Sequence, residues 1–182
     1  YAYLSSWNGM VDARFLADLL KEGIRVRYAR KPFRLNGKKY ERGTLIITRA
    51  DNANKLGFME ILRKLSKKHS RSLDMALTGF VDNGKDFGSR DVQLIPETNI
   101  GVIMGDPAST LRYGEVWHFM EQQLGYPFSA LDADYVNNIN LDDYNILVLP
   151  DGSGYRKLMG EGFLKELKSW VSRGGKLIAM GR

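Results

Sequence analysis

Apolar and polar residues alternate, or recur at helical spacing, along the first half of the chain. Two alternating stretches and two mostly apolar ones predict strands, in the order YAYLSSW, IRVRY, TLIIT and LDMALTGF. The stretch MVDARFLADLLKEG places Val11, Phe15 and Leu19 on one face, which predicts a helix that ends at Gly23. Asn8 precedes this helix and is a candidate N-cap.

The rest of the first half contains a hairpin signal, a second helix and a loop-like segment. The pair Asn36-Gly37 predicts a tight hairpin turn. A helix that buries Phe58 is expected to extend to about Lys68, and we expect RADNANK before it to supply capping side chains. Segment 81–99, rich in Gly, Asp and Asn, predicts either a functional loop or a connection between two lobes.

The second half alternates strand-like and helix-like stretches, which is typical of a parallel sheet with right-handed crossovers. The expected strands lie near 100–104, 128–132, 145–149 and 176–180, and the expected helices near 113–124 and 158–172. Ile146 to Leu149 are apolar without interruption, as in a strand that is covered on both faces. We therefore predict the fold class α/β: a smaller basic α/β lobe with a hairpin (1–95), then a parallel flavodoxin-like sheet (96–182).

Composition excludes several function classes. The chain of 182 residues contains no cysteine, which rules out a thiol nucleophile, a disulfide framework and a thiolate metal site. No apolar stretch is long enough to span a membrane. The net charge of +6 is unevenly divided, because residues 1–95 carry 19 Lys or Arg against 10 Asp or Glu, whereas residues 96–182 carry 8 against 11.

The basic excess of the first lobe raises the possibility of a polyanion partner. The charges alternate with apolar residues, as on the solvent-exposed faces of helices and strands. No nucleic-acid-binding motif accompanies them. We therefore do not expect nucleic acid as a partner. A polyanion-binding module remains a third alternative, built on Arg25, Arg27, Arg30, Lys31, Lys38 and Lys39.

One helix of the second lobe carries two metal-like spacings around His118. Glu115-x-x-His118 and His118-x-x-Glu121 each place a nitrogen and a carboxylate on one helix face. A catalytic zinc site requires a third protein ligand, and the other histidine of the chain, His69, belongs to the first lobe. We therefore expect no zinc site here and interpret His118 as a packed or capping residue.

Two polar loops follow the first and third strands of the second lobe, GDPAST (105–110) and PDGSGYR (150–156). Because the carboxyl ends of parallel strands share one edge, we expect both loops there, at the place where α/β folds bind ligands. GDPAST lacks the glycine patterns of nucleotide-binding loops, so we expect only a shallow site for a sulfate or carboxylate, without catalytic residues. The candidate ligand-binding residues are Ser109, Thr110, Arg112, Asp151, Ser153 and Arg156.

Two stretches of the second lobe resemble a known superfamily. YNILVLPDG and LKSWVSRGGKLIAMG are similar to the third strand and the helix-to-fourth-strand passage of class I glutamine amidotransferase-like domains. In that superfamily the nucleophilic cysteine follows the fourth strand, at about the position of Arg182. Because this chain has arginine there and no cysteine, the resemblance implies the fold without the amidotransferase chemistry.

Four further stretches resemble a second family: GTLIITRADN, TGFVDNGKDFGS, GEVWHFMEQQLGYP and LDADY. They are similar to the region downstream of the catalytic domain in bacterial zinc carboxypeptidase-like proteins, in the peptidase family that includes carboxypeptidase A. The family's catalytic H-x-x-E motif and distant histidine do not map onto this chain, since His118-x-x-Glu121 lies on a crossover helix.

This second resemblance implies a non-catalytic accessory region, cut within its amidotransferase-like domain, whose parent protein is a zinc metallocarboxypeptidase-like hydrolase. It places the zinc in the parent's catalytic domain, upstream of Tyr1, and the protein outside the cytoplasm of a bacterium. The implied partners are the parent's catalytic domain and a peptide or glycan. The alternative is a free-standing α/β hydrolase or ligand-binding domain of the amidotransferase-like superfamily that uses the two polar loops.

Overall fold

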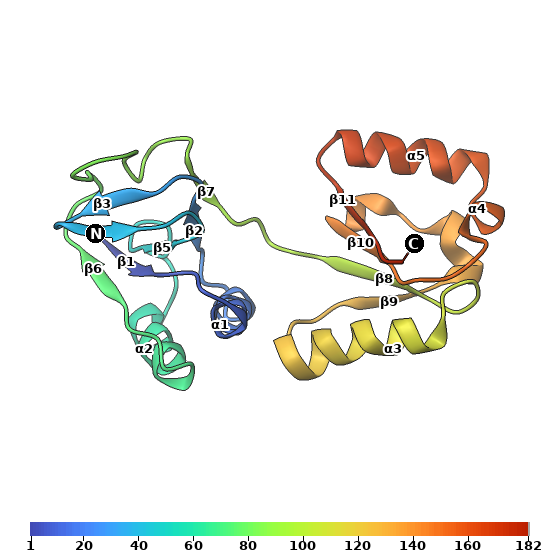
Figure 1. The fold of residues 1–182 in the computed structure, drawn as a ribbon, viewed down its shortest axis with the longest axis horizontal. Coiled ribbons are helices and arrows are strands. Elements are labelled where there is room, and N and C mark those ends of the chain that lie inside the picture. The colour runs from blue at the N-terminus through green and yellow to red at the C-terminus, as the bar shows by residue number, and fades with distance from the viewer. Residues whose placement is uncertain (182) are drawn as a thin grey trace. The chain divides into compact units, whose positions relative to one another are not determined.

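The sheet of the N-terminal half is antiparallel and has five strands in the order β6-β1-β5-β2-β7. A computed structural model describes residues 1–181, and the chain divides into two units, Tyr1–Pro96 and Glu97–Arg182 (Figure 1). The strands of the first sheet are β1 (Ala2–Ser5), β2 (Arg27–Ala29), β5 (Leu45–Thr48), β6 (Asp74–Ala76) and β7 (Val92–Leu94).

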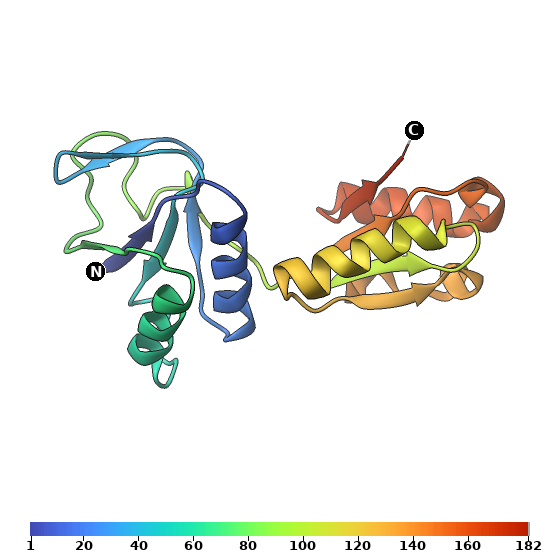
Figure 2. The same ribbon diagram turned by 60° about the horizontal axis from the view of Figure 1, so that its bottom comes forward.

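The central strand β5 is buried on both faces, which explains why TLIIT is apolar throughout. Side chains alternate across a strand, so Leu45 and Ile47 pack with helices α1 (Met10–Lys21) and α2 (Phe58–Lys68). Ile46 points to the opposite face, where it packs with the hairpin. The first unit therefore has three layers, with both helices on one face of the sheet (Figure 2).

The hairpin consists of β3 (Phe33–Leu35) and β4 (Lys38–Tyr40), as the Asn36-Gly37 pair predicted. Asn36 and Gly37 both have positive φ angles, 51° and 73°, as a two-residue hairpin turn requires. Phe33 stacks on Tyr40 with ring centroids 4.9 Å apart, and Phe87 meets Phe33 edge-on at 5.4 Å.

Three local predictions for the first unit are wrong. Gly9, not Asn8, is the N-cap of α1, and the Asp12 carboxylate accepts hydrogen bonds from the Asn8 and Gly9 backbone N–H groups. The RADNANK side chains do not cap α2, which begins after Gly57. Segment 81–99 is not only a loop, because pairing with β2 makes Val92–Leu94 a strand.

The polar side chains of RADNANK instead connect the turn after β5 to β2. Arg27 donates two hydrogen bonds to the Asp51 carboxylate, at 2.6 and 2.9 Å, and Thr48 donates a third at 2.7 Å. Asn52 is buried and forms hydrogen bonds with the backbone N–H and C=O of Arg25 and with the Thr48 carbonyl. These residues stabilise the pairing of two interior strands, β5 and β2, rather than a helix end.

The second unit is a four-stranded parallel sheet in the order β11-β10-β8-β9, so the prediction of four parallel strands is confirmed. The strands are β8 (Ile100–Met104), β9 (Ser129–Asp132), β10 (Ile146–Leu149) and β11 (Lys176–Ala179). Their connections contain α3 (Thr110–His118) with its π-helical extension η1 (Phe119–Leu124), the 3₁₀ turns η2 (Ala133–Asn138) and η3 (Leu141–Asp143), α4 (Tyr155–Leu158) and α5 (Glu161–Ser172).

The helices α3 and α5 lie on opposite faces of this sheet (Figure 1). Val102 and Val148 pack under α3, whereas Leu147 and Leu149 pack under α5. β10 is therefore covered on both faces, as its uninterrupted apolar sequence predicted. The edge strand β11 is different, because its four residues are all exposed.

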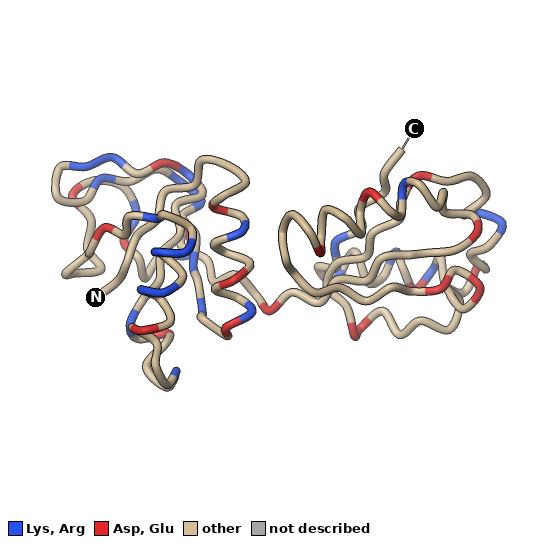
Figure 3. Tube along the Cα trace, turned by 90° about the horizontal axis from the view of Figure 1, so that it is seen from below, with Lys and Arg blue, Asp and Glu red and all other residues tan. Residues whose placement is uncertain are grey.

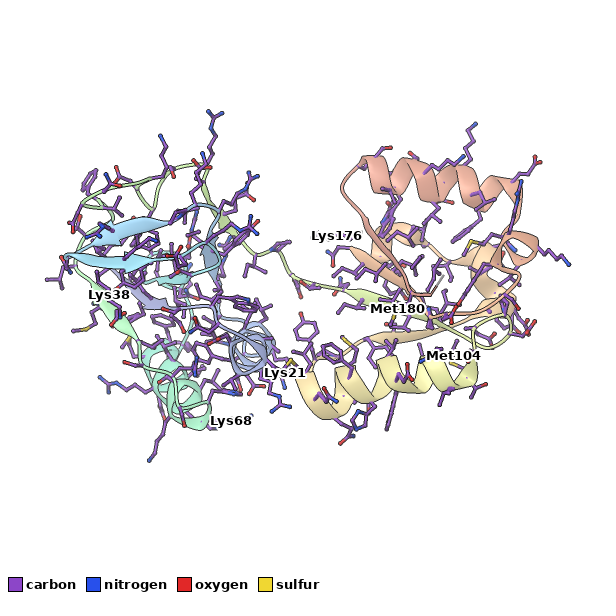
Figure 4. All side chains as sticks on the ribbon, viewed as in Figure 1. Lys21, Lys38, Lys68, Met104, Lys176 and Met180 are labelled. Atoms are coloured by element: carbon purple, nitrogen blue, oxygen red, sulfur yellow. The ribbon has the colours of Figure 1, made fainter. Side chains whose placement is uncertain are left out.

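An ion cluster joins the two helices of the first unit. The Asp18 carboxylate on α1 contacts Lys21 Nζ at 2.8 Å, Lys68 Nζ at 2.6 Å and His69 Nε2 at 2.8 Å, and Figure 4 labels the two lysines. Burial raises the pKa of Asp18, but the hydrogen bonds from the two lysines and His69 outweigh it and hold the pKa well below its usual value of 3.8. His69, to which the sequence analysis gave no role, is thus part of an interhelical contact.

Replacing Asp18 with asparagine is expected to lower the free energy of unfolding by about 1 kcal/mol near neutral pH. The folded-state pKa is lowered, so this stability is present above the usual pKa and is lost as pH falls below about 4. The difference between wild type and variant should therefore shrink in acid. Urea titrations followed by circular dichroism at both pH values measure it, with the exposed Glu22→Gln as control. A difference that persists unchanged in acid would contradict the role of the charge.

Candidate functional site

The two polar loops lie at the carboxyl edge of the parallel sheet, on neighbouring strands. After β8 the chain passes to β9 on one side, and it then returns to β10 on the other side of β8. The gap between the ends of β8 and β10 is therefore the point where the strand order reverses, the usual ligand position in open α/β sheets. Figure 1 shows these strand ends beside α4.

Backbone contacts join the loops at this point. Ala108 and Gly152 form an isolated antiparallel bridge, and the Ser109 N–H donates to the Asp151 carbonyl at 2.9 Å. The approach is so close that a Cβ at position 152 would clash with the Pro107 carbonyl oxygen. The structure thus brings the two predicted loops together, and the backbone itself occupies much of the space between the strand ends.

Of the candidates from the first loop, Arg112 is engaged within its own helix. Its Nη1 lies 2.8 and 3.0 Å from the two carboxylate oxygens of Glu115, and both side chains are exposed. Glu115, with a smaller contribution from Asp151, raises the pKa of Arg112. Ser109 and Thr110 lie at the start of α3, where the first backbone N–H groups of a helix lack intrahelical partners.

The candidates from the second loop lie next to the end of β11. The Asp151 carboxylate lies against Gly181, and Tyr155 donates to the Pro150 carbonyl at 2.8 Å. Burial raises the pKa of Tyr155, and the charge of Asp151 adds to this effect. Ser153 and Arg156 are exposed. Arg182, at the position that the resemblance gives to a nucleophile, lies outside the described residues.

This edge offers a few backbone N–H groups, the three hydroxyls of Ser109, Thr110 and Ser153, and one arginine, Arg156, to a ligand. Asp106 and Asp132 follow neighbouring strands and oppose an anion, although the Asp132 carboxylate accepts the Asp134 N–H at 3.0 Å. The arrangement suits weak binding of a small anion. Among the hydrogen bonds of residues 1–181, none at this edge joins a nucleophilic side chain to a base.

The structure corrects the interpretation of His118, which is exposed rather than packed. Its Nδ1 lies 3.4 Å from Gln123 Nε2, and Glu115 of the same helix is paired with Arg112. Within residues 1–181, no group of three or more His, Asp or Glu side chains has the arrangement of a metal site.

Four of the six basic residues considered above for a polyanion-binding module are paired with acidic ones. Figure 3 shows blue and red positions interspersed along the trace of this unit. The pairs are Arg27–Asp51, Lys31–Asp91, Lys38–Asp74 and Lys39–Glu41. This pairing weakens the positive field that such a polyanion-binding patch would need.

Sequence reasoning missed a cavity of about 670 Å³ beside the TGFVDNGKDFGS segment. The segment is an ordered loop, because the Phe87 N–H donates to the Gly79 carbonyl and the Val81 N–H donates to the Asp86 carboxylate, both at 2.9 Å. Leu77, directly before this segment, and Phe80 within it are 84% and 74% exposed. The lining residues are Tyr1, Leu77, Thr78, Gly79, Phe80, Asp86, Gly88 and Ser89.

The sequence did contain a signal for this cavity, because aromatic residues occur among the Gly and Asp residues of the segment. The same Gly and Asp residues are typical of turns, so the segment was interpreted as a loop and the cavity was not predicted.

Comparisons with protein-family models, with curated proteins and with solved structures give no match for the chain. Within residues 1–181, every helix is too short or too polar to cross a membrane.

Proposed function

We propose that the chain is a non-catalytic recognition region of a zinc metallocarboxypeptidase-like protein. The observation that carries this proposal is that polar residues in the stretches that resemble this family form hydrogen bonds and ion pairs within the fold. Asp51 binds Arg27, Asn52 binds the Arg25 backbone and Asp86 binds the Val81 N–H. Carboxylates and amides that hold turns and strands in place are not free to act as general bases or metal ligands.

The recognition surface in this proposal is the cavity at loop 77–89. Exposed Phe80 and Leu77 supply apolar area, and Thr78 and Asp86 supply polar groups in the same lining. Such a mixture of aromatic and polar groups suits a peptide or a glycan, since each ligand presents an apolar face beside hydrogen-bonding groups. The parent's catalytic domain is the proposed intramolecular partner.

The second unit is proposed to be an amidotransferase-like, flavodoxin-type domain that serves as a scaffold. Its strand order, with β8 and β10 central, supports this assignment. The closed backbone contact between Ala108 and Gly152 supports a structural role, because it fills the position where a ligand or nucleophile of such a fold would lie.

A hydrolysis assay tests the non-catalytic assignment. The chain is incubated with stoichiometric Zn²⁺ and N-acylated dipeptides that end in an aromatic or a basic residue, and the released amino acid is measured. We expect no release above a buffer control. Saturable hydrolysis that a chelator abolishes would overturn the assignment, and loss of that activity in His118→Ala would assign it to this chain rather than to a contaminant.

The alternative, a free-standing hydrolase or ligand-binding domain, is favoured by one observation: the two polar loops meet where the strand order reverses. The encoding gene separates the two proposals. An H-x-x-E zinc domain encoded upstream of Tyr1 supports the accessory region, whereas a start codon immediately before Tyr1 supports the free-standing domain.

A further inference from the structure

Helix α2 presents a row of basic side chains to solvent. Arg63, Lys64 and Lys67, called the basic row below, are exposed and recur at the spacing of one helix face. Glu60 lies one turn before them on the same face. Figure 4 shows side chains that extend outward from this helix, beside the labelled Lys68. The buried face of α2 packs in the core of the first unit, so folding does not require the basic row.

The basic row has no acidic partner among the ion pairs of residues 1–181. The basic residues that follow it along the chain are paired, since Lys68 contacts Asp18 and Arg71 contacts Asp12. Pairing of this kind weakens the field of a cation outside its own neighbourhood. The basic row therefore directs its positive charge to solvent, and Glu60 is the acid on the same helix face that opposes it.

A protruding leucine precedes this face of α2. Leu56 is 91% exposed, more than any other large apolar side chain among residues 1–181. The next residue, Gly57, lines a shallow surface hollow together with Phe58, Met59, Glu60 and the basic row. All of these lining residues belong to α2 or to its N-cap, so the hollow is an open face and not an enclosed site for a small molecule.

We propose that this face of α2 docks onto an anionic phospholipid surface, with Leu56 inserted below the headgroups and the basic row at the phosphate layer. Charge complementarity selects the partner, because each lysine or arginine close to an anionic lipid surface strengthens binding. Leu56 selects lipid over a nucleic acid backbone or a polyphosphate, since only the lipid offers an apolar phase that buries it. The face shares no residue with the cavity at loop 77–89, so this docking is independent of the recognition function proposed above.

Vesicle sedimentation measures the docking. The whole chain is mixed at about 0.1 M salt with phosphatidylcholine vesicles that contain or lack about 30% phosphatidylglycerol. We expect binding to the anionic vesicles alone, and weaker binding at about 0.5 M salt, where charges are screened more strongly. The triple variant Arg63→Gln, Lys64→Gln, Lys67→Gln should lower the partition coefficient at least about tenfold.

A second triple variant controls for net charge. Arg30→Gln, Arg34→Gln, Lys85→Gln removes three exposed cations outside α2 that also lack an ion pair within residues 1–181. This variant should bind anionic vesicles within about threefold of wild type. Both variants change exposed side chains and should fold, as circular dichroism verifies. Equal losses in the two variants would overturn the proposal, because total charge and not the face of α2 would then determine binding.

A fluorescent label tests the insertion of Leu56, since the chain has no cysteine of its own. Leu56→Cys and Leu111→Cys, the second at an exposed leucine of the second unit, are each labelled with a polarity-sensitive dye. We expect anionic vesicles to increase the emission of the label at position 56 and to leave that at position 111 unchanged. Equal responses of the two labels would overturn the proposal. Binding of polyphosphate without any sedimentation on anionic vesicles would also overturn it, and would assign the face to a soluble polyanion.

Discussion

Replacing Trp170 with alanine is expected to lower the free energy of unfolding of the second unit by about 3–5 kcal/mol. Trp170 on α5 is 4% exposed and packs with Leu147 and Leu141 in the core between α5 and the sheet. Its Nε1–H donates to the Tyr144 carbonyl at 3.1 Å, so truncation removes packing and also leaves that carbonyl without this partner. Urea unfolding followed by far-ultraviolet circular dichroism measures the loss.

The neighbouring residue Val171 provides the control for Trp170. Val171 is exposed on the same helix, so Val171→Ala should cost less than about 1 kcal/mol. Equal effects of the two substitutions would mean that helix propensity, and not burial against the sheet, determines the stability of α5. The burial pattern of α5 predicts a clear separation between them.

Replacing Gly152 with alanine is expected to cost about 1–3 kcal/mol, because a Cβ there forces backbone apart. The Cβ would clash with the Pro107 carbonyl oxygen, so the loops after β8 and β10 would have to separate. The Ala108–Gly152 bridge and the hydrogen bond from Ser109 to Asp151 would weaken together. The same urea titration measures the change.

The matched control is the same substitution at Gly162, in the first turn of α5. A Cβ at Gly162 meets nothing within 4 Å, and alanine has the higher helix propensity. Gly162→Ala should therefore be neutral or stabilise by up to about 1 kcal/mol. A Gly152→Ala variant as stable as wild type would show that the two loops can move apart without a loss of stability. The contact between the loops would then not contribute to the free energy of unfolding.

Local patterns predicted much of the secondary structure of this chain. The hairpin at Asn36-Gly37 and the four parallel strands of the second unit depend on turn chemistry and on short-range apolar periodicity, which are visible in a single sequence. Both polar loops were placed at one sheet edge because parallel strands end at the same side. The contact between them also needed Gly152, because a Cβ there would clash with the Pro107 carbonyl oxygen.

The failures occur where a distant partner determines the local structure. Val92–Leu94 lies in a Gly- and Asp-rich segment and is a strand only because β2 pairs with it. Asp51 and Asn52 have the composition of helix caps, yet Arg27 and the Arg25 backbone bind them more than twenty residues away. His118 follows the helical apolar pattern closely enough to be predicted as packed, but the sheet contacts other faces of α3.

The sequence by itself determined the α/β class, the parallel direction of the four strands in the second unit and the hairpin of the first, since apolar periodicity, helical crossovers and turn residues are visible in short stretches. Tertiary structure alone decided which polar groups are engaged and which surfaces stay open. Asp18 and His69 meet across 51 positions, the cavity at loop 77–89 includes Tyr1 from the first residues of the chain, and the four residues of β11 are exposed. Periodicity marks a residue as apolar or polar, but only packing in three dimensions selects its partner.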